Sequence, residues 1–151
     1  MNLQRIILGV VIVILLYIVY RYFAASDRST LVNYHNATEQ LSVSASSLPT
    51  GVTSNYSFSI WFYVNEWNYR YGEEKVVFQR TDANSDPAPR VYLDPTTNNL
   101  HVSVATYKTD GDASTSNVSV CSVDNVPLQA WTNLIITLNN RALDLYLNGK
   151  L

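Results

Sequence analysis

The chain has 151 residues, with 10 lysines and arginines against 12 aspartates and glutamates, a formal net charge of −2. Residues 31–151 carry 7 basic and 11 acidic side chains, and no basic patch, so a nucleic-acid partner is not expected. The 11 tyrosines, 3 tryptophans and low proportion of charge are typical of antiparallel sheets, and the length suits one domain.

After a short tail over residues 1–5, the stretch Ile6–Tyr20 contains no charged residue, and 12 of its 15 members are Ile, Leu or Val. Extended to Phe23, it predicts a transmembrane helix over residues 6–23. Arg5 and Arg21 flank it and can reach the two interfaces with their charged ends. The chain would then be anchored in a membrane by a single helix.

A cleaved signal peptide is the alternative, because Ala24-Ala25-Ser26 offers the small residues that cleavage requires. Arg21 and Phe23 beside that site argue against it. Basic residues are almost evenly balanced across the apolar stretch, with Arg5 on one side and Arg21 and Arg28 on the other. The side of the membrane that the domain faces therefore stays open.

Residues 24–54 are rich in Ser and Thr, with Pro49 and Gly51 as breakers, and are predicted to be a linker. An early edge strand over Leu41–Ala45 and a plain tether are both compatible with this composition.

Short strands follow. Phe58, Ile60, Phe62 and Val64 alternate with polar or aromatic residues, which predicts a strand with one buried face. Further strands are predicted around Val91 and Leu93, around Leu100, Val102 and Val104, and around Val118 and Val120, with a turn over residues 94–99.

The last 26 residues predict a hairpin. Leu134, Ile136 and Leu138 alternate on one side of the Asn139-Asn140-Arg141 turn, and Leu143, Leu145 and Leu147 alternate on the other. Asn148-Gly149 then provides a strong signal for a second tight turn, because both positions accept positive φ. Only Lys150 and Leu151 follow it, so we expect that the natural polypeptide continues beyond Leu151 or that another chain completes the sheet.

The pattern P-L-x-x-W-T-N-L-I-I-x-L … L-D-L-Y-L-N-G-K-L resembles the concanavalin A-like lectin/glucanase superfamily in its laminin-G-like form. Residues 57–64 and 75–78 resemble two earlier strands of the same family, so the resemblance covers about residues 56–151. It implies an all-β antiparallel jelly-roll sandwich over residues 55–151, incomplete at its C-terminus and preceded by one transmembrane helix. These motifs are specific for the fold and say little about function.

Catalysis is not expected. A retaining glucanase needs two carboxylates about 5–5.5 Å apart, usually supplied by an E-x-D-x-x-E-like run, and the sequence contains no such run. The neighbours Glu73 and Glu74 would point to opposite faces of a strand and are more simply explained as part of a solvated loop. His35 and His101 are the only histidines, and no serine elbow accompanies them.

No cofactor is expected either. Asp110-Gly111-Asp112 has the form of a calcium loop, and the family resemblance implies calcium as a candidate ligand. A lone pair of aspartates in a Ser/Thr-rich loop is more often a simple turn, so Asp110 and Asp112 are weak candidates.

Aromatic residues are the stronger candidates for a contact surface with a carbohydrate or a protein. Trp61 and Tyr63 lie on the face opposite Phe58 and Ile60, and Trp67 and Tyr69 occupy the following loop. In the competing interpretation, Trp61 packs under another sheet or loop and Trp67 anchors its own loop. We expect Trp131 to be structural, because it opens the best-defined strand of the sequence.

Cys121 is the only cysteine and is compatible with a buried apolar residue or a free thiol. The family resemblance implies a disulfide to a residue beyond Leu151. Three N-x-S/T sequons begin at Asn36, Asn55 and Asn117 and would be modified only if the domain faces a lumen or the outside.

These features together favour a non-catalytic, membrane-anchored interaction module. An N-terminal anchor before a laminin-G-like sandwich resembles proteins of large DNA viruses of algae and protists. That resemblance implies a minor virion protein that links the internal membrane to capsid proteins. A surface carbohydrate-binding lectin and a truncated glycoside hydrolase are the alternatives.

Overall fold

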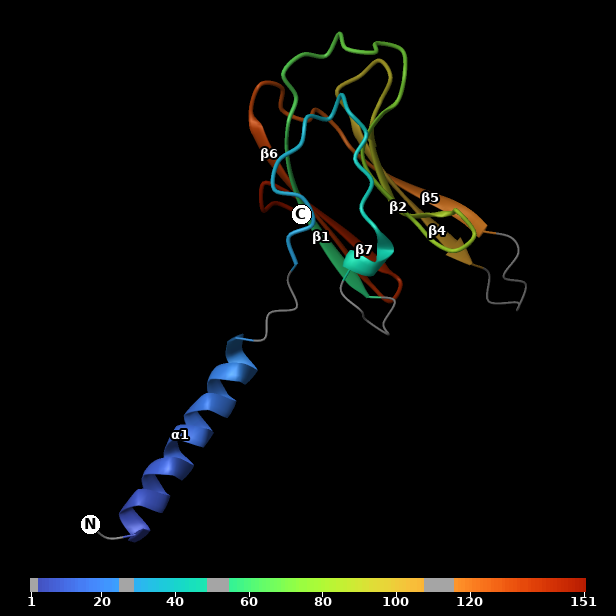
Figure 1. Cartoon of the computed structure of the whole chain (residues 1–151). Coiled ribbons are helices and arrows are strands. Elements are labelled where there is room, and N and C mark those ends of the chain that lie inside the picture. Colours follow the sequence, from blue (N-terminus) through green and yellow to red (C-terminus); the bar gives the residue numbers. More distant parts are fainter. Residues whose placement is uncertain (1–2, 25–28, 49–54, 108–115) are drawn as a thin grey trace. The chain divides into compact units, whose positions relative to one another are not determined.

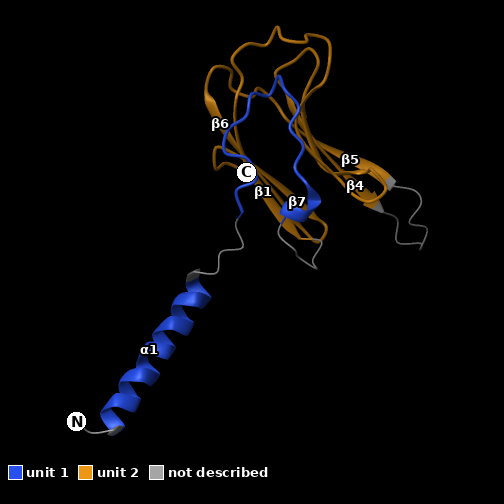
Figure 2. Ribbon diagram, in the orientation of Figure 1, with its two compact units in different colours: residues 1–52 blue, residues 53–151 orange. Residues whose placement is uncertain are grey.

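The computed structural model describes residues 3–24, 29–48, 55–107 and 116–151. The chain divides into two compact units, Met1–Val52 and Thr53–Leu151, which Figure 2 shows in different colours.

The first unit begins with one long apolar helix, α1, over Leu3–Ala24 (Figure 1). At 1.5 Å per residue its length is about 33 Å, close to the ~30 Å hydrocarbon core of a bilayer. The segment Gln4–Phe23 is apolar enough to cross a membrane, and its large apolar side chains are all exposed. A signal sequence near the N-terminus can also be long and apolar enough to meet these criteria, so the helix is compatible with both interpretations of the sequence.

The rest of the described part of this unit, residues 29–48, contains no strand. A short 3₁₀ helix, η1, spans Ala45–Ser47, and the hydroxyl of Ser44 accepts a hydrogen bond from the Ser46 backbone N–H at 3.4 Å. Local serine hydroxyls of this kind offer the backbone an alternative to a sheet ladder. The suggested edge strand over Leu41–Ala45 is therefore not formed.

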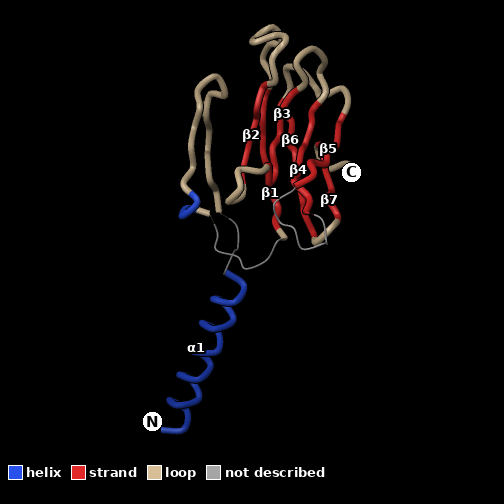
Figure 3. The backbone as a smooth tube through the Cα atoms, turned by 90° about the vertical axis from the view of Figure 1, so that its right-hand side faces the viewer, coloured by secondary structure: helices blue, strands red, loops and turns tan. Residues whose placement is uncertain are grey.

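The second unit is a sandwich of seven antiparallel strands, as Figures 1 and 3 show. One sheet has three strands in the order β1-β6-β7, and the other has four in the order β2-β3-β4-β5. The strands are β1 (Tyr56–Tyr63), β2 (Lys75–Thr81), β3 (Pro87–Leu93), β4 (Leu100–Tyr107), β5 (Ser116–Val123), β6 (Trp131–Asn139) and β7 (Ala142–Leu147). This architecture confirms the fold class expected from the sequence.

The core lies between the sheets and consists of the alternating apolar residues. Leu134 and Ile136 on β6, Val91 on β3, and Leu100 and Val102 on β4 have no exposed surface. Burying a side chain of this size completely contributes about 1.5–3 kcal/mol. Burial of the alternating apolar side chains that predicted these strands is therefore the main source of the sandwich's stability.

The predicted C-terminal turns are confirmed. Asn140 between β6 and β7 has a φ of 58°, and its backbone N–H donates to Oδ1 of Asn55 at 2.7 Å. Asn148 and Gly149 have φ values of 50° and 78°, the left-handed pair that a type I′ turn requires. Leu147 and Lys150 close this turn with reciprocal backbone hydrogen bonds of 2.8 and 3.0 Å.

Candidate functional site

Three large aromatic side chains lie together on the outer face of the three-stranded sheet. Tyr63 on β1 pairs with Trp131 on β6, and Trp61 occupies the same face two residues before Tyr63. The exposed fractions are 65% for Trp61, 43% for Tyr63 and 57% for Trp131. We call these three residues the aromatic face.

Strand parity places these rings outside. The fully buried positions of β6 are Thr132, Leu134 and Ile136, so Trp131 and Asn133 must point to the opposite side of the sheet. The Tyr63 and Trp131 ring centroids are 5.6 Å apart with an interplanar angle of 55°, within the range of favourable aromatic pairs. The pair thus joins two neighbouring strands of a regular ladder.

Amide and hydroxyl groups border the rings. The side-chain amide of Asn133, whose backbone position pairs with Trp61, donates to Oγ of Ser59 at 3.2 Å and to the carbonyl of Ile60 at 3.3 Å. Further along the ladder, the hydroxyls of Ser57 and Thr137 lie 3.2 Å apart. The outward positions of these paired strands are all uncharged: Ser57, Ser59, Trp61, Tyr63, Trp131, Asn133, Ile135 and Thr137.

Trp61 therefore does not pack under another element among the described residues of its unit, and that interpretation of the sequence was wrong. Trp131 does open β6, as expected, but its ring belongs to the exposed surface. The buried positions Leu134 and Ile136 lie an odd number of residues away, so parity alone could have revealed this. Trp131 thus both begins β6 and contributes an exposed ring to the surface, and only the first of these was predicted.

Trp67 and Tyr69 do not share this arrangement. The Trp67 ring packs against the core, with the Lys75 ammonium 4.9 Å from its centroid, as the loop-anchoring interpretation predicts. Its indole N–H is buried and has no hydrogen-bond partner in the part of the chain that the structure describes. Tyr69 lies in the loop between β1 and β2 and is 44% exposed.

The remaining predicted sites are dispersed. Asp110 and Asp112, the weak calcium candidates, lie outside the described residues. The disulfide from Cys121 to a residue beyond Leu151 stays a prediction. Cys121 is a half-buried free thiol on β5. Within the described ranges, no group of three or more His, Cys, Asp or Glu side chains gathers to hold a metal ion. The sequon asparagines are all exposed: Asn36, Asn55 and Asn117.

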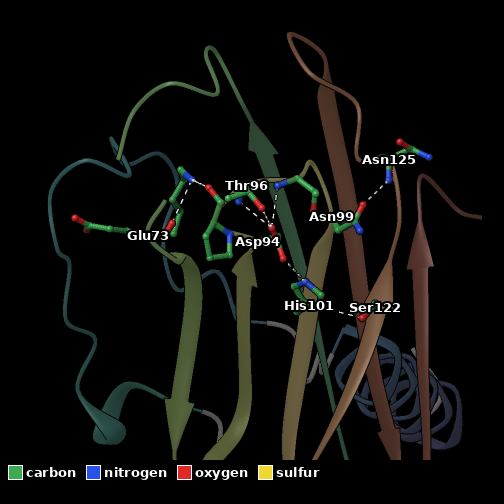
Figure 4. Close-up of polar contacts among 10 residues, drawn as sticks. Glu73, Asp94, Thr96, Asn99, His101, Ser122 and Asn125 are labelled. Carbon is green, nitrogen blue, oxygen red and sulfur yellow. Dashed lines mark hydrogen bonds and ion pairs between the residues drawn. The ribbon is translucent and has the colours of Figure 1, made fainter. Parts of the chain in front are cut away.

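A polar cluster of Asp94, His101 and Ser122 lies at the end of the four-stranded sheet (Figure 4). Nδ1 of His101 is 2.9 Å from Oγ of Ser122, and Nε2 is 3.4 Å from Oδ2 of Asp94. The His101 ring also stacks on Tyr92, with centroids 5.2 Å apart. Sequence patterns gave no sign of this cluster, because its members meet only through the pairing of β3, β4 and β5.

The carboxylate of Asp94 organises the turn between β3 and β4. Its Oδ1 accepts the backbone N–H groups of Thr96 and Thr97, both at 2.8 Å. These two hydrogen bonds hold the pKa of Asp94 well below its usual range. Because its other oxygen faces His101, Asp94 connects the turn to β4 and, through Ser122, to β5.

The same three residue types form the triad of serine hydrolases. Here Ser122 sits within a regular strand rather than on the strained turn that exposes a catalytic serine. The acidic loop residues Glu73 and Glu74 are exposed and form ion pairs with Arg70 and Arg90, respectively. Both carboxylates thus have structural partners, which agrees with their interpretation as members of a solvated loop.

Comparison with known proteins identifies the family of the sandwich. The family model of the concanavalin A-like lectin/glucanases superfamily matches residues 35–151, which is most of the chain and includes the whole sandwich. No curated protein and no solved structure matches the chain significantly.

Proposed function

Since the chain belongs to the concanavalin A-like lectin/glucanases superfamily, we propose that it is a non-catalytic binding module whose aromatic face holds a carbohydrate. Domains of this type generally bind proteins or carbohydrates. The observation that carries the proposal is the placement of Trp61, Tyr63 and Trp131 on one exposed face.

Chemistry favours a sugar on this face. The flat rings offer apolar surfaces on which the C–H side of a pyranose ring can stack, and the amide of Asn133 and nearby hydroxyls suit its hydroxyl groups. The outward positions of the paired β1 and β6 carry no charge, which suits a neutral glycan better than an ionic one.

A protein partner is the second candidate. Exposed Trp and Tyr side chains are also enriched among the residues that dominate protein–protein binding energy. In this case the apolar helix α1 would hold the module at a membrane while the aromatic face contacts another protein. The specific partner that we propose for this case is a capsid protein.

Screening separates the two candidates. The full chain in detergent micelles is applied to a glycan array and, separately, used to capture proteins, with Trp61→Ala and Trp131→Ala variants beside the wild type. If the ligand is a carbohydrate, we expect the wild type to bind the array and each of the two substitutions to abolish this binding. Protein capture that needs both rings, without array binding, would instead establish the second candidate.

The non-catalytic part of the proposal rests on the environment of the polar cluster and on the paired glutamates. Treatment of the full chain with a fluorophosphonate probe tests the cluster. We expect no covalent label on Ser122, and a label that is lost in His101→Ala would contradict the proposal.

A further inference from the structure

The side-chain amide of Asn133 has one fixed orientation. Its Nδ2 lies 3.2 Å from Oγ of Ser59 and 3.3 Å from the backbone carbonyl oxygen of Ile60. A carbonyl oxygen carries no proton and can only accept a hydrogen bond, so the nitrogen of the amide must face it, and not the oxygen. Both hydrogens of Nδ2 therefore have acceptors on β1.

This orientation leaves the oxygen of the Asn133 amide available. Among the described residues, no group donates a hydrogen bond to Oδ1 of Asn133, and the hydroxyl of Ser59 accepts from Nδ2 without donating its own hydrogen. Asn133 is half-buried and Ser59 is exposed. The two side chains thus present one unused acceptor beside one unused donor.

The backbone of Asn133 is also held in place. Its N–H donates to Oδ1 of Asn148 at 2.9 Å, and its carbonyl oxygen accepts from the N–H of Asn148 at 2.8 Å. Asn148 belongs to the tight turn after β7, so this turn fixes the position from which the Asn133 side chain extends. A group held in this way loses little freedom when a ligand binds, which favours affinity.

The unused acceptor and donor lie beside the ring of Trp61. Asn133 pairs directly with Trp61, and residues opposite each other in antiparallel strands have Cβ atoms about 4.5–5.5 Å apart. Ser59 lies two residues before Trp61 and therefore on the same side of β1. A sugar ring stacked on Trp61 has hydroxyl groups within hydrogen-bond reach of both side chains.

We propose that Asn133 is the residue that selects the glycan. Its Oδ1 accepts a hydrogen bond from a free hydroxyl of the sugar stacked on Trp61, and Ser59 donates to a neighbouring oxygen of the same sugar. This inference rests on the proposed function and names its ligand class: a neutral hexose with an unsubstituted hydroxyl at this position. A sugar without that hydrogen leaves Oδ1 covered and unpaired, which costs the desolvation of a polar group.

The test uses trisaccharides of glucose, galactose, mannose and N-acetylglucosamine and, for each, the forms in which fluorine replaces one hydroxyl at a time. Fluorine removes the hydrogen that Oδ1 would accept. Calorimetric titration of the full chain in detergent micelles compares the wild type with Asn133→Ala and Asn139→Ala. Asn139 is the matched control, because it is an exposed asparagine on the same side of β6, about 20 Å further along the strand. Circular dichroism verifies that each variant is folded.

We expect the wild type to bind at least one of these trisaccharides, and replacement of one particular hydroxyl to weaken this binding about fivefold or more. Asn133→Ala should weaken binding of the parent sugar by a similar factor and should no longer respond to that replacement. Asn139→Ala should stay within about twofold of the wild type and remain sensitive to it. Such non-additivity between the protein variant and the sugar variant identifies a direct contact.

Two results would overturn the inference while the proposed function stands. One is binding that depends on Trp61 but that no single fluorine replacement weakens. The other is a fluorine effect that is equally large in Asn133→Ala and in the wild type. A wild type that binds none of the four parent trisaccharides would also overturn the inference, whereas the glycan array decides the proposed function separately.

Discussion

Substituting Trp61 by alanine should cost the sandwich little stability, because this residue is 65% exposed. A fully buried aromatic side chain covers about 150–250 Å². The remaining third of Trp61 therefore corresponds to roughly 50–85 Å², or about 1–2 kcal/mol at ~25 cal/mol per Å². This is an upper bound, because the unfolded chain already covers part of its surface.

Leu134→Ala is the matched comparison in the core of the same sheet. Leu134 has no exposed surface, and removing a buried leucine side chain costs about 2–5 kcal/mol. The two variants should therefore differ clearly in the free energy of unfolding, although the tryptophan is the larger side chain.

Urea unfolding of the full chain in detergent micelles measures both values. All 3 tryptophans lie in the sandwich unit, so their fluorescence reports on that unit without a contribution from α1. Trp67 remains as a reporter when Trp61 is replaced. A loss of about 3 kcal/mol or more for Trp61→Ala, equal to that of Leu134→Ala, would refute the reasoning, because it would mean that the ring is covered.

Three further predictions follow from other parts of the chain. The backbone N–H groups of Thr96 and Thr97 lower the pKa of Asp94, so its contribution to stability is fully present above about pH 4, the unfolded value, and is lost as the pH falls through the folded value. Urea midpoints measured from roughly pH 6 to pH 2 should fall more steeply for the wild type than for Asp94→Asn, and parallel curves would contradict this origin of the shift. Gly149 has a φ of 78° with open space around its Cβ position, so Gly149→Val should lose about 1–2 kcal/mol from backbone strain. Gly149→Asn should lose less in the same urea assay, and equal losses would argue against strain. In α1, replacing Ile12 and Leu15 by Arg costs about 2.5–3.5 kcal/mol for each residue in a membrane, so the double variant should leave the carbonate-washed pellet. A mature N-terminus at Ser26 or Asp27 in the wild type would show a signal peptide instead.

Much of the fold followed from local patterns. The alternation of Leu134, Ile136 and Leu138 predicted both a strand and its buried face, and the Asn148-Gly149 pair predicted a tight turn. These signals are short-range consequences of pleat geometry and of backbone sterics, so they can be recognised in a sequence by itself.

The candidate sites were harder to predict, because they depend on which strands become neighbours. Tyr63 and Trp131 are far apart in sequence and meet only through the register of β1 and β6. The contact between His101 and Ser122 requires the register of β4 and β5 in the same way. No local pattern encodes such a pairing, although strand parity could have placed Trp131 outside once Leu134 was assigned to the core.

The most direct test of the account is a calorimetric titration with the oligosaccharide that binds best on the glycan array. Tyr63 and Tyr69 are suited to it, since they are the same residue type with exposed fractions of 43% and 44%, and only Tyr63 belongs to the aromatic face. We predict that Tyr63→Ala weakens binding about tenfold or more, while Tyr69→Ala stays within about twofold of the wild type. Equal losses in the two variants, or an unchanged affinity in Tyr63→Ala, would contradict a binding site on the aromatic face.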